Sequence, residues 1–181
     1  MQRHFLLDAS ALIPFFLDIK DERMVRAAIL KLLSLRDQNK AVLWVPNFCL
    51  AECSKAFAAR LYSHSSSAEG ARNRYRQAVE KMLDIVSSSR KGLIRSLNLE
   101  RAHLVAIEDV FNAQWAMNPR SEGLSGFDGL VLTMARDLLK KYGTDSVRLV
   151  TNDRWMATVC KQNPDLLPHA VLASKEPIPD G

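Results

Sequence analysis

Short apolar runs alternate with longer amphipathic segments along the chain. The short runs are almost continuously apolar, which is typical of strands that are buried on both faces of a sheet. They lie at residues 4–7, 42–45, 93–97, 147–150 and 170–173. Runs of this length predict a sheet of about five strands.

Between these runs, apolar residues recur at the three- to four-residue spacing of amphipathic helices. The clearest such segments begin near Met24, Phe48, Leu104 and Phe127. The last of them ends in two lysines, a tyrosine and a glycine, and basic residues followed by glycine are typical stop signals of a helix. Strands that alternate with helices form βαβ units. The sequence therefore predicts an α/β fold, an α/β/α sandwich with a mostly parallel central sheet.

Composition and length favour one globular domain over residues 1–181, because 48% of the residues are hydrophobic and 25% are charged. These fractions exclude a disordered or collagen-like chain. Charges interrupt every apolar run before the roughly 18 residues of a membrane span, so we expect no membrane partner. The apolar stretch before Asp8 is too short for a secretory signal, and three cysteines are an odd number for a disulfide framework. We therefore expect a cytoplasmic protein.

The net charge of +5 is concentrated in the middle of the chain. Between Arg60 and Arg101, basic residues outnumber acidic ones by five, which is the same excess as in the whole chain. Serine-rich breaks bracket this segment, so we expect a basic helical insertion at approximately residues 63–92. Such a surface suits a polyanion, because each phosphate that contacts lysine or arginine releases counterions, although a solvated helix face explains the same charge. The candidate RNA-binding residues are Arg72, Arg74 and Arg76.

Four acidic residues stand where the carboxyl ends of the predicted strands would meet. Asp8 ends the first run, Asp153 follows the fourth run, Glu52 lies on the helix after the second, and Asp128 begins a further helix. In an open α/β sheet, ligands bind outside the carboxyl ends of the strands. Carboxylates that converge there raise one another's pKa values unless a cation lies between them. The pattern therefore predicts a cation site.

Each acid also has a purely structural explanation. Asp8 and Asp153 can cap the helices that follow them, and Asp128 can form a capping box with the serine three residues earlier. Glu52 can pair with a lysine one turn further along its helix. This explanation is weakest for Glu52, because its segment is otherwise apolar and a carboxylate is costly there without a cation.

The segments that carry the four acids resemble the four motifs of the PIN-domain nucleases. Residues 6–10 are similar to the family's first strand followed by Asp-x-Ser, and residues 47–52 are similar to its glutamate-bearing helix. Residues 125–135 resemble its third motif, an aspartate that leads an apolar helix. Residues 149–154 resemble the fourth, a strand that ends in Thr-x-Asp. All four occur in the family's order.

This resemblance implies an α/β/α sandwich whose acids hold Mg²⁺ or Mn²⁺ and hydrolyse RNA phosphodiester bonds. It assigns the catalytic and metal-binding roles to Asp8, Glu52, Asp128 and Asp153, and supporting roles to Ser10, Thr151 and Asn152. The best-known small members are VapC-like toxins, each neutralised by an antitoxin, so the resemblance suggests an antitoxin protein and a homodimer as partners. This chain is longer than those toxins commonly are, and the extra length is the Arg-rich block.

The chemistry of the acids agrees with this interpretation. Hard divalent cations take carboxylate and water oxygens, and Mg²⁺ usually keeps only a few protein ligands. Four acids are enough for one such ion or for two. The histidines have no metal-binding spacing, and we interpret Cys49 and Cys53 as small core residues.

Two other folds that begin with a similar strand are excluded. A phosphatase of the haloacid-dehalogenase type needs a second acid two residues after the first, where this chain has Ser10. A dinucleotide-binding domain needs Gly-x-Gly-x-x-Gly after the first strand, which this chain lacks. The alternative from a different class is a PIN-like RNA-binding or protein-interaction module with little or no catalysis. The presence of all four acids favours the nuclease.

Overall fold

A six-stranded parallel sheet forms the centre of the computed structural model, which describes residues 2–17, 19, 22–87, 92–117 and 123–179. Its strand order is β3-β4-β2-β1-β5-β6. The strands are β1 (Arg3–Leu7), β2 (Ala41–Pro46), β3 (Val86–Ser87), β4 (Ile94–Leu97), β5 (Val147–Thr151) and β6 (His169–Leu172).

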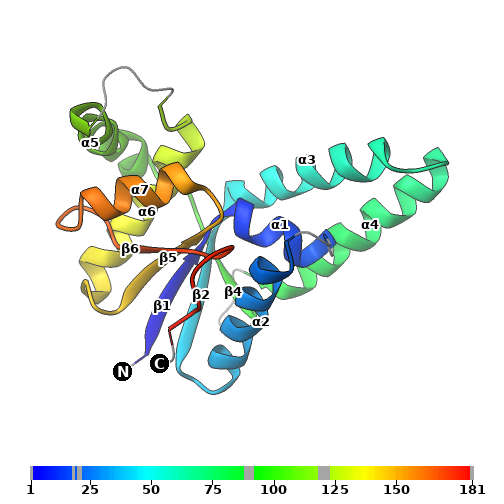
Figure 1. Ribbon diagram of the computed structural model, residues 1–181, viewed down its shortest axis with the longest axis horizontal. Helices are drawn as coiled ribbons and strands as arrows, with labels where there is room; N and C mark the ends of the chain where they lie inside the picture. Colours follow the sequence, from blue (N-terminus) through cyan, green and yellow to red (C-terminus); the bar gives the residue numbers. More distant parts are fainter. Residues whose placement is uncertain (1, 18, 20–21, 88–91, 118–122, 180–181) are drawn as a thin grey trace.

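Helices cover both faces of this sheet, as Figure 1 shows. One group, α1 to α4, lies on one side and the other, α5 to α7, lies on the opposite side. The α/β class, the sandwich and the parallel sheet expected from the sequence are thus confirmed. The helices are α1 (Ala9–Leu17), α2 (Arg23–Asp37), α3 (Asn47–Ser63), α4 (Ala68–Ile85), α5 (Arg101–Met117), α6 (Gly126–Tyr142) and α7 (Arg154–Gln162).

The sheet places the candidate acids at one edge because β1 lies between β2 and β5 and runs parallel to both. Leu6 is in register with Trp44 of β2, and Leu7 is in register with Val150 of β5. Asp8 continues this alignment, since its backbone N–H donates to the Val150 carbonyl at 3.0 Å. The chain leaves β1 toward β2 on one side and returns as β5 on the other. This is the switch point at which an open parallel sheet forms a crevice.

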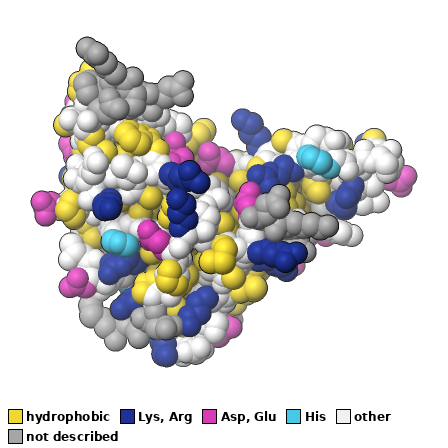
Figure 2. Space-filling view, viewed as in Figure 1, with side chains coloured by type: hydrophobic (Ala, Val, Ile, Leu, Met, Phe, Trp, Pro, Cys, Tyr) yellow, Lys and Arg dark blue, Asp and Glu magenta, His cyan; other side chains and the backbone are white. Residues whose placement is uncertain are grey.

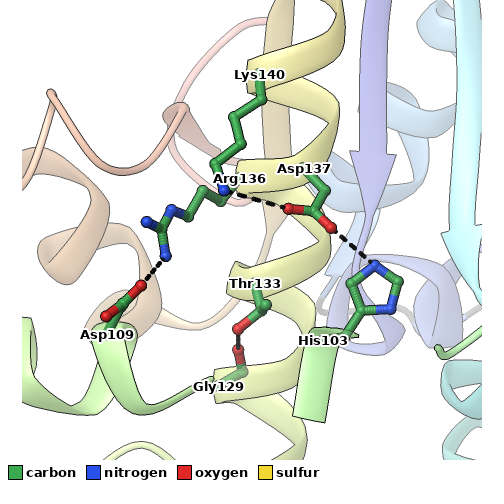
Figure 3. Close-up of polar contacts among 7 residues, drawn as sticks. All are labelled: His103, Asp109, Gly129, Thr133, Arg136, Asp137 and Lys140. Atoms are coloured by element: carbon green, nitrogen blue, oxygen red, sulfur yellow. Dashed lines mark hydrogen bonds and ion pairs between the residues drawn. The ribbon is translucent and has the colours of Figure 1, made fainter. Parts of the chain in front are cut away.

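Contacts between α5 and α6 fix the helix that carries Asp128 (Figure 3). The Arg136 guanidinium on α6 pairs with Asp109 on α5, and His103 Nε2 lies 3.1 Å from Asp137. The helices approach closely at Gly129, where a Cβ atom would lie 3.0 Å from the Ile107 side chain. A larger residue there would therefore press α5 away from the beginning of α6.

A helical arm projects from the sheet, and it consists of α3 and α4 running back along each other (Figure 1). The Arg-rich block of the sequence forms α4, which begins with the N-cap Ser67. Its buried Ala71, Ala78 and Met82 face the rest of the protein, and its exposed side chains include the arginines. Residues 88–91 of the insertion that the sequence predicts lie outside the described part of the chain. Among the described helices, none combines the length and apolar character of a membrane span.

Candidate functional site

The four acids singled out in the sequence line one cleft of about 580 Å³. Asp8 enters it from the end of β1 and Glu52 from the second turn of α3. Asp128 lies in the first turn of α6, and Asp153 lies between β5 and α7. The structure therefore brings together side chains from four separate segments at the carboxyl edge of the sheet.

Asp8 is the most enclosed of these acids, with 6% of its surface exposed. Its Oδ1 accepts the backbone N–H of Ala9 at 2.7 Å. Its Oδ2 accepts the Ser10 hydroxyl at 2.5 Å, the Ser10 backbone N–H at 3.3 Å and the Thr151 hydroxyl at 3.1 Å. Burial raises the pKa of Asp8, and the hydrogen bonds from Ser10, Thr151 and Ala9 oppose this rise. The carboxylate is thus fixed in one orientation.

The predicted supporting residues form a small network that joins the ends of β1 and β5. The Ser10 and Thr151 hydroxyl oxygens lie 3.2 Å apart. The backbone N–H of Asn152 donates to Ser10 Oγ at 2.8 Å, and that of Asp153 donates to Thr151 Oγ1 at 3.0 Å. Ser10 and Thr151 therefore act through their side chains, whereas Asn152 contributes its backbone. The network sets the relative position of Asp8 and Asp153.

Glu52 is half-buried, and its charge is disfavoured in the cleft. Burial raises the pKa of Glu52 most, and repulsion from Asp8 and Asp128 adds to the rise. A hydrogen bond with Cys49 and the charge of Lys55 act in the opposite direction. The three carboxylates therefore interact with one another, as convergent acids are expected to do.

Cys49 belongs to this cluster, which the sequence analysis missed when it interpreted the residue only as core. Its sulfur and carboxylate oxygens of Asp8 and Glu52 all lie within 4.8 Å of one another. Burial and these two acids raise the pKa of the Cys49 thiol far above its usual range, and burial raises that of Cys53 to about 12. Cys49 thus stays a protonated thiol that hydrogen bonds with Glu52. The spacing of three residues between Cys49 and Glu52 is the signal that could have shown it.

Three of the acids cap helices, as the structural explanation expected, because Asp8 accepts the backbone N–H groups of Ala9 and Ser10 at the beginning of α1. Asp153 Oδ1 accepts the backbone N–H groups of Trp155 at 2.7 Å and Met156 at 2.9 Å. Asp128 and Ser125 form a reciprocal capping box at the beginning of α6. The Asp153 and Asp128 caps each use one carboxylate oxygen, which leaves the second oxygen for a ligand in the cleft. Capping and ligand binding are therefore compatible roles.

An aromatic wall and one lysine complete the cleft, and sequence reasoning named none of these residues as functional. Phe48 and Phe127 line it from α3 and α6, and their rings stack with centroids 5.6 Å apart. Lys55 lies on α3 one turn beyond Ala51. The sequence feature that could have identified Phe127 is its position directly before Asp128.

The predicted RNA-binding arginines do not line the cleft. Arg72, Arg74 and Arg76 are exposed on α4, in the arm. The Arg74 guanidinium donates to Ser65 Oγ at 2.8 Å, which attaches it to the turn between α3 and α4. Figure 2 shows lysine and arginine side chains spread along this arm. Their role in binding RNA remains a prediction.

Comparisons with known proteins leave the family open. No protein-family model matches the chain, and no curated protein matches its sequence. Among solved structures, the fold is similar to the crystal structure of PAE2754 from Pyrobaculum aerophilum, with a TM-score of 0.44 and 12% sequence identity. The likeness covers 88% of this chain and 86% of that chain. At this level of similarity, the function has to be argued from the site itself.

Proposed function

We propose that this protein is a divalent-metal-dependent ribonuclease that hydrolyses RNA phosphodiester bonds in the cleft between α3 and α6. The observation that supports this most is the convergence of Asp8, Glu52, Asp128 and Asp153 on one cleft at the switch point of the sheet. Structural capping accounts for the positions of Asp8, Asp128 and Asp153. It does not account for Glu52, whose carboxylate is half-buried in the second turn of α3 and repelled by two neighbours.

The donor atoms fit Mg²⁺ or Mn²⁺, which prefer carboxylate oxygens. Asp8 and Glu52 supply such oxygens close together, while the Cys49 thiol beside them stays protonated and is a poor ligand for a hard ion. When bound, such an ion would activate water and stabilise the oxygen that leaves phosphorus. Ser10 and Thr151 hold the Asp8 carboxylate in place, and the caps hold one oxygen each of Asp128 and Asp153. Hydrogen bonds thus hold three of the four carboxylates in place before any ligand enters.

RNA is the proposed substrate because the segment from Arg60 to Arg101, which includes the three exposed arginines of α4, accounts for the net charge of +5. The proposal of an antitoxin partner, of a homodimer and of a cytoplasmic location rests on the resemblance to PIN-domain toxins and on the sequence alone.

Metal binding and cleavage can be tested together. A ligand that binds only the folded state at a hundredfold excess over its Kd stabilises it by about 2.7 kcal/mol, which corresponds to a rise in Tm of roughly 5 to 10 °C. We expect Mn²⁺ and Mg²⁺ to raise the Tm and to support cleavage of single-stranded RNA over the same concentration range. Glu52→Gln should weaken both effects, whereas Glu108→Gln, an exposed glutamate of α5, should weaken neither.

The proposal is wrong if millimolar Mn²⁺ neither raises the Tm nor supports cleavage, or if EDTA leaves the cleavage unchanged. Metal-dependent stabilisation together with RNA binding but no cleavage would instead favour the binding module.

A further inference from the structure

The wall of the cleft holds an aromatic pair that neither capping nor the acids explain. The rings of Phe48 and Phe127 stack at an interplanar angle of 28°, and Phe127 remains 51% exposed. Phe48 is half-buried behind it and packs against the main core. An exposed phenylalanine that is held flat against a second ring presents a rigid apolar face to the cleft.

This face lies directly beside the acids. Phe127 precedes Asp128, and Phe48 stands one helical turn before Glu52. Small or apolar side chains also line the cleft, among them Ile13, Ala51, Ala56 and Ala59. The cleft therefore offers a flat apolar surface and a cation-binding surface next to each other. A nucleotide has the matching pair of groups, a planar base and a phosphate.

We propose that Phe127, supported by Phe48, is the surface on which a nucleobase stacks when the adjoining phosphate occupies the acid cleft. This inference rests on the proposed nuclease function and identifies how that site takes hold of its substrate. Every base has a π-face, and a phenylalanine offers no hydrogen bond to read base edges. The subsite therefore holds any of the four bases and contributes affinity without sequence preference.

Binding measurements with a base removed test the stacking directly. The probe is a short labelled single-stranded RNA whose nucleotides are replaced one at a time by abasic riboses, and Kd is measured by fluorescence anisotropy in Ca²⁺. Stacking of one base on an aromatic side chain corresponds to about 5- to 150-fold in affinity. For the wild-type protein, we expect one abasic position to raise Kd by this factor. Phe127→Ala should bind the intact RNA as weakly as the wild type binds the abasic RNA. Removal of the base should not weaken the binding of this variant any further.

Two control variants separate stacking from damage to the fold. Phe127→Trp should keep the sensitivity to the abasic position, because it retains an aromatic face. Trp115→Ala removes another exposed aromatic residue, 66% exposed on α5 and not part of the cleft wall, and should bind like the wild type. The Tm of each variant checks that it is folded.

The results distinguish this inference from the nuclease proposal. If the wild type cleaves RNA but Phe127→Ala shows the same abasic penalty as the wild type, stacking is wrong and the nuclease stands. If the penalty disappears in Phe127→Ala but no variant cleaves RNA, stacking stands and the nuclease proposal is wrong. If Phe127→Ala changes the oligomeric state and leaves RNA affinity unchanged, the exposed ring contacts a second copy of the chain and the inference is overturned.

Discussion

Burial imposes a cost on the Asp8 carboxylate that its hydrogen bonds offset only in part. The pKa of this group lies above its ordinary value, so the folded protein binds its proton more tightly than the unfolded chain does. This contribution to stability is present below the ordinary pKa of an aspartate and is lost as the pH rises through the raised value. Above the raised pKa, the ionised Asp8 therefore destabilises the folded protein in the absence of a cation.

Asp8→Asn removes this charge and keeps the shape of the side chain. Without divalent metal, we expect the variant to lose little heat stability, because the removal of a buried charge that repels Glu52 offsets the hydrogen bond that the amide nitrogen cannot accept. With metal, the variant should gain less in Tm than the wild type and should not cleave RNA. Scanning calorimetry with and without Mn²⁺ measures the first two effects. Cleavage above about a tenth of the wild-type rate, which is a loss of less than about 1.4 kcal/mol in transition-state stabilisation, would remove Asp8 from the catalytic site.

His4 is a second residue whose charge is disfavoured, at a place remote from the acids. Its ring stacks on Tyr142 with centroids 3.6 Å apart, and Trp44 Nε1–H donates to its Nδ1 at 3.1 Å. Burial lowers the pKa of His4, and the positive charges of Arg95 and Lys141 lower it further. These cations lie over the Trp44 and Tyr142 rings, at 5.3 and 5.2 Å. The neutral ring is thus part of the packing.

A lowered histidine pKa makes the folded state less stable in acid. Below about pH 6.5, the unfolded chain takes up the His4 proton before the folded protein does, so the free energy of unfolding falls as the pH falls. We expect the stability advantage of the wild type over His4→Phe to shrink between about pH 7.5 and pH 5. Urea denaturation of both proteins at each pH measures it, and the acids of the cleft contribute equally to both. An advantage that does not change with pH would contradict this role.

At the scale of the element, the beginning of α6 serves both the helix and the cleft. Ser125 caps the helix through its hydroxyl, and Asp128 returns a bond to the Ser125 N–H while lining the cleft. Removing a serine N-cap costs about 0.5–2 kcal/mol of stability. Variants of the two residues therefore allow the structural role of the capping box to be separated from the proposed catalytic role of Asp128.

We expect Ser125→Ala to lower the free energy of unfolding by about 1 kcal/mol and to keep most of the RNA cleavage at a temperature where it is folded. Asp128→Asn should keep the free energy of unfolding and lose RNA cleavage, because an asparagine oxygen still accepts the Ser125 N–H but carries no charge. Chemical denaturation and cleavage of the same preparations compare the two variants. If the two variants lose the same fraction of cleavage activity, Asp128 contributes to cleavage only by capping α6.

The elements that the sequence predicted correctly are those with a clear period or a clear end. All five predicted strands are present, displaced by a residue or two at most. The additional strand β3 has two residues and is too short to show any pattern. The first helix, α1, was recognised only as a segment that Asp8 could cap, because its residues are nearly all apolar and Pro14 lies inside it. Periodicity also gives no partner for a helix, so the pairing of α3 with α4 could not be predicted.

The part of the candidate site that lies at the ends of strands could be predicted from the sequence. Parallel strands place their carboxyl ends at one edge, which is why Asp8 and Asp153 could be expected close together. The position of Phe127 in the wall of the cleft could not be predicted from the sequence, since apolar residues at helical spacing normally belong to the core. Its exposure depends on how α6 begins relative to α3, which is a property of the tertiary structure.

At the scale of the whole molecule, the three arginines of α4 and the four acids of the cleft occupy different regions. The acids lie at the edge of the sheet, whereas Arg72, Arg74 and Arg76 lie on the projecting arm. A strand of RNA that reaches from the arm to the cleft would contact phosphates at a distance from the bond that is cut. Contacts of this kind position the nucleic acid and contribute affinity, and they do not take part in the chemical step.

Replacing the three arginines of α4 with glutamine tests this division. We expect weaker RNA binding and a shallower dependence of log K on log salt concentration, by about 0.7 for each phosphate of a single strand that the variant no longer neutralises. Single-turnover cleavage at saturating RNA should change little, because none of the three side chains lines the cleft. The matched control removes the same charge from Arg23, Lys40 and Lys140, which are exposed outside the arm, and should leave the salt dependence closer to that of the wild type. An identical salt dependence for the wild type and the α4 variant would mean that these arginines are a solvated helix face, and that the RNA reaches the acids by another route.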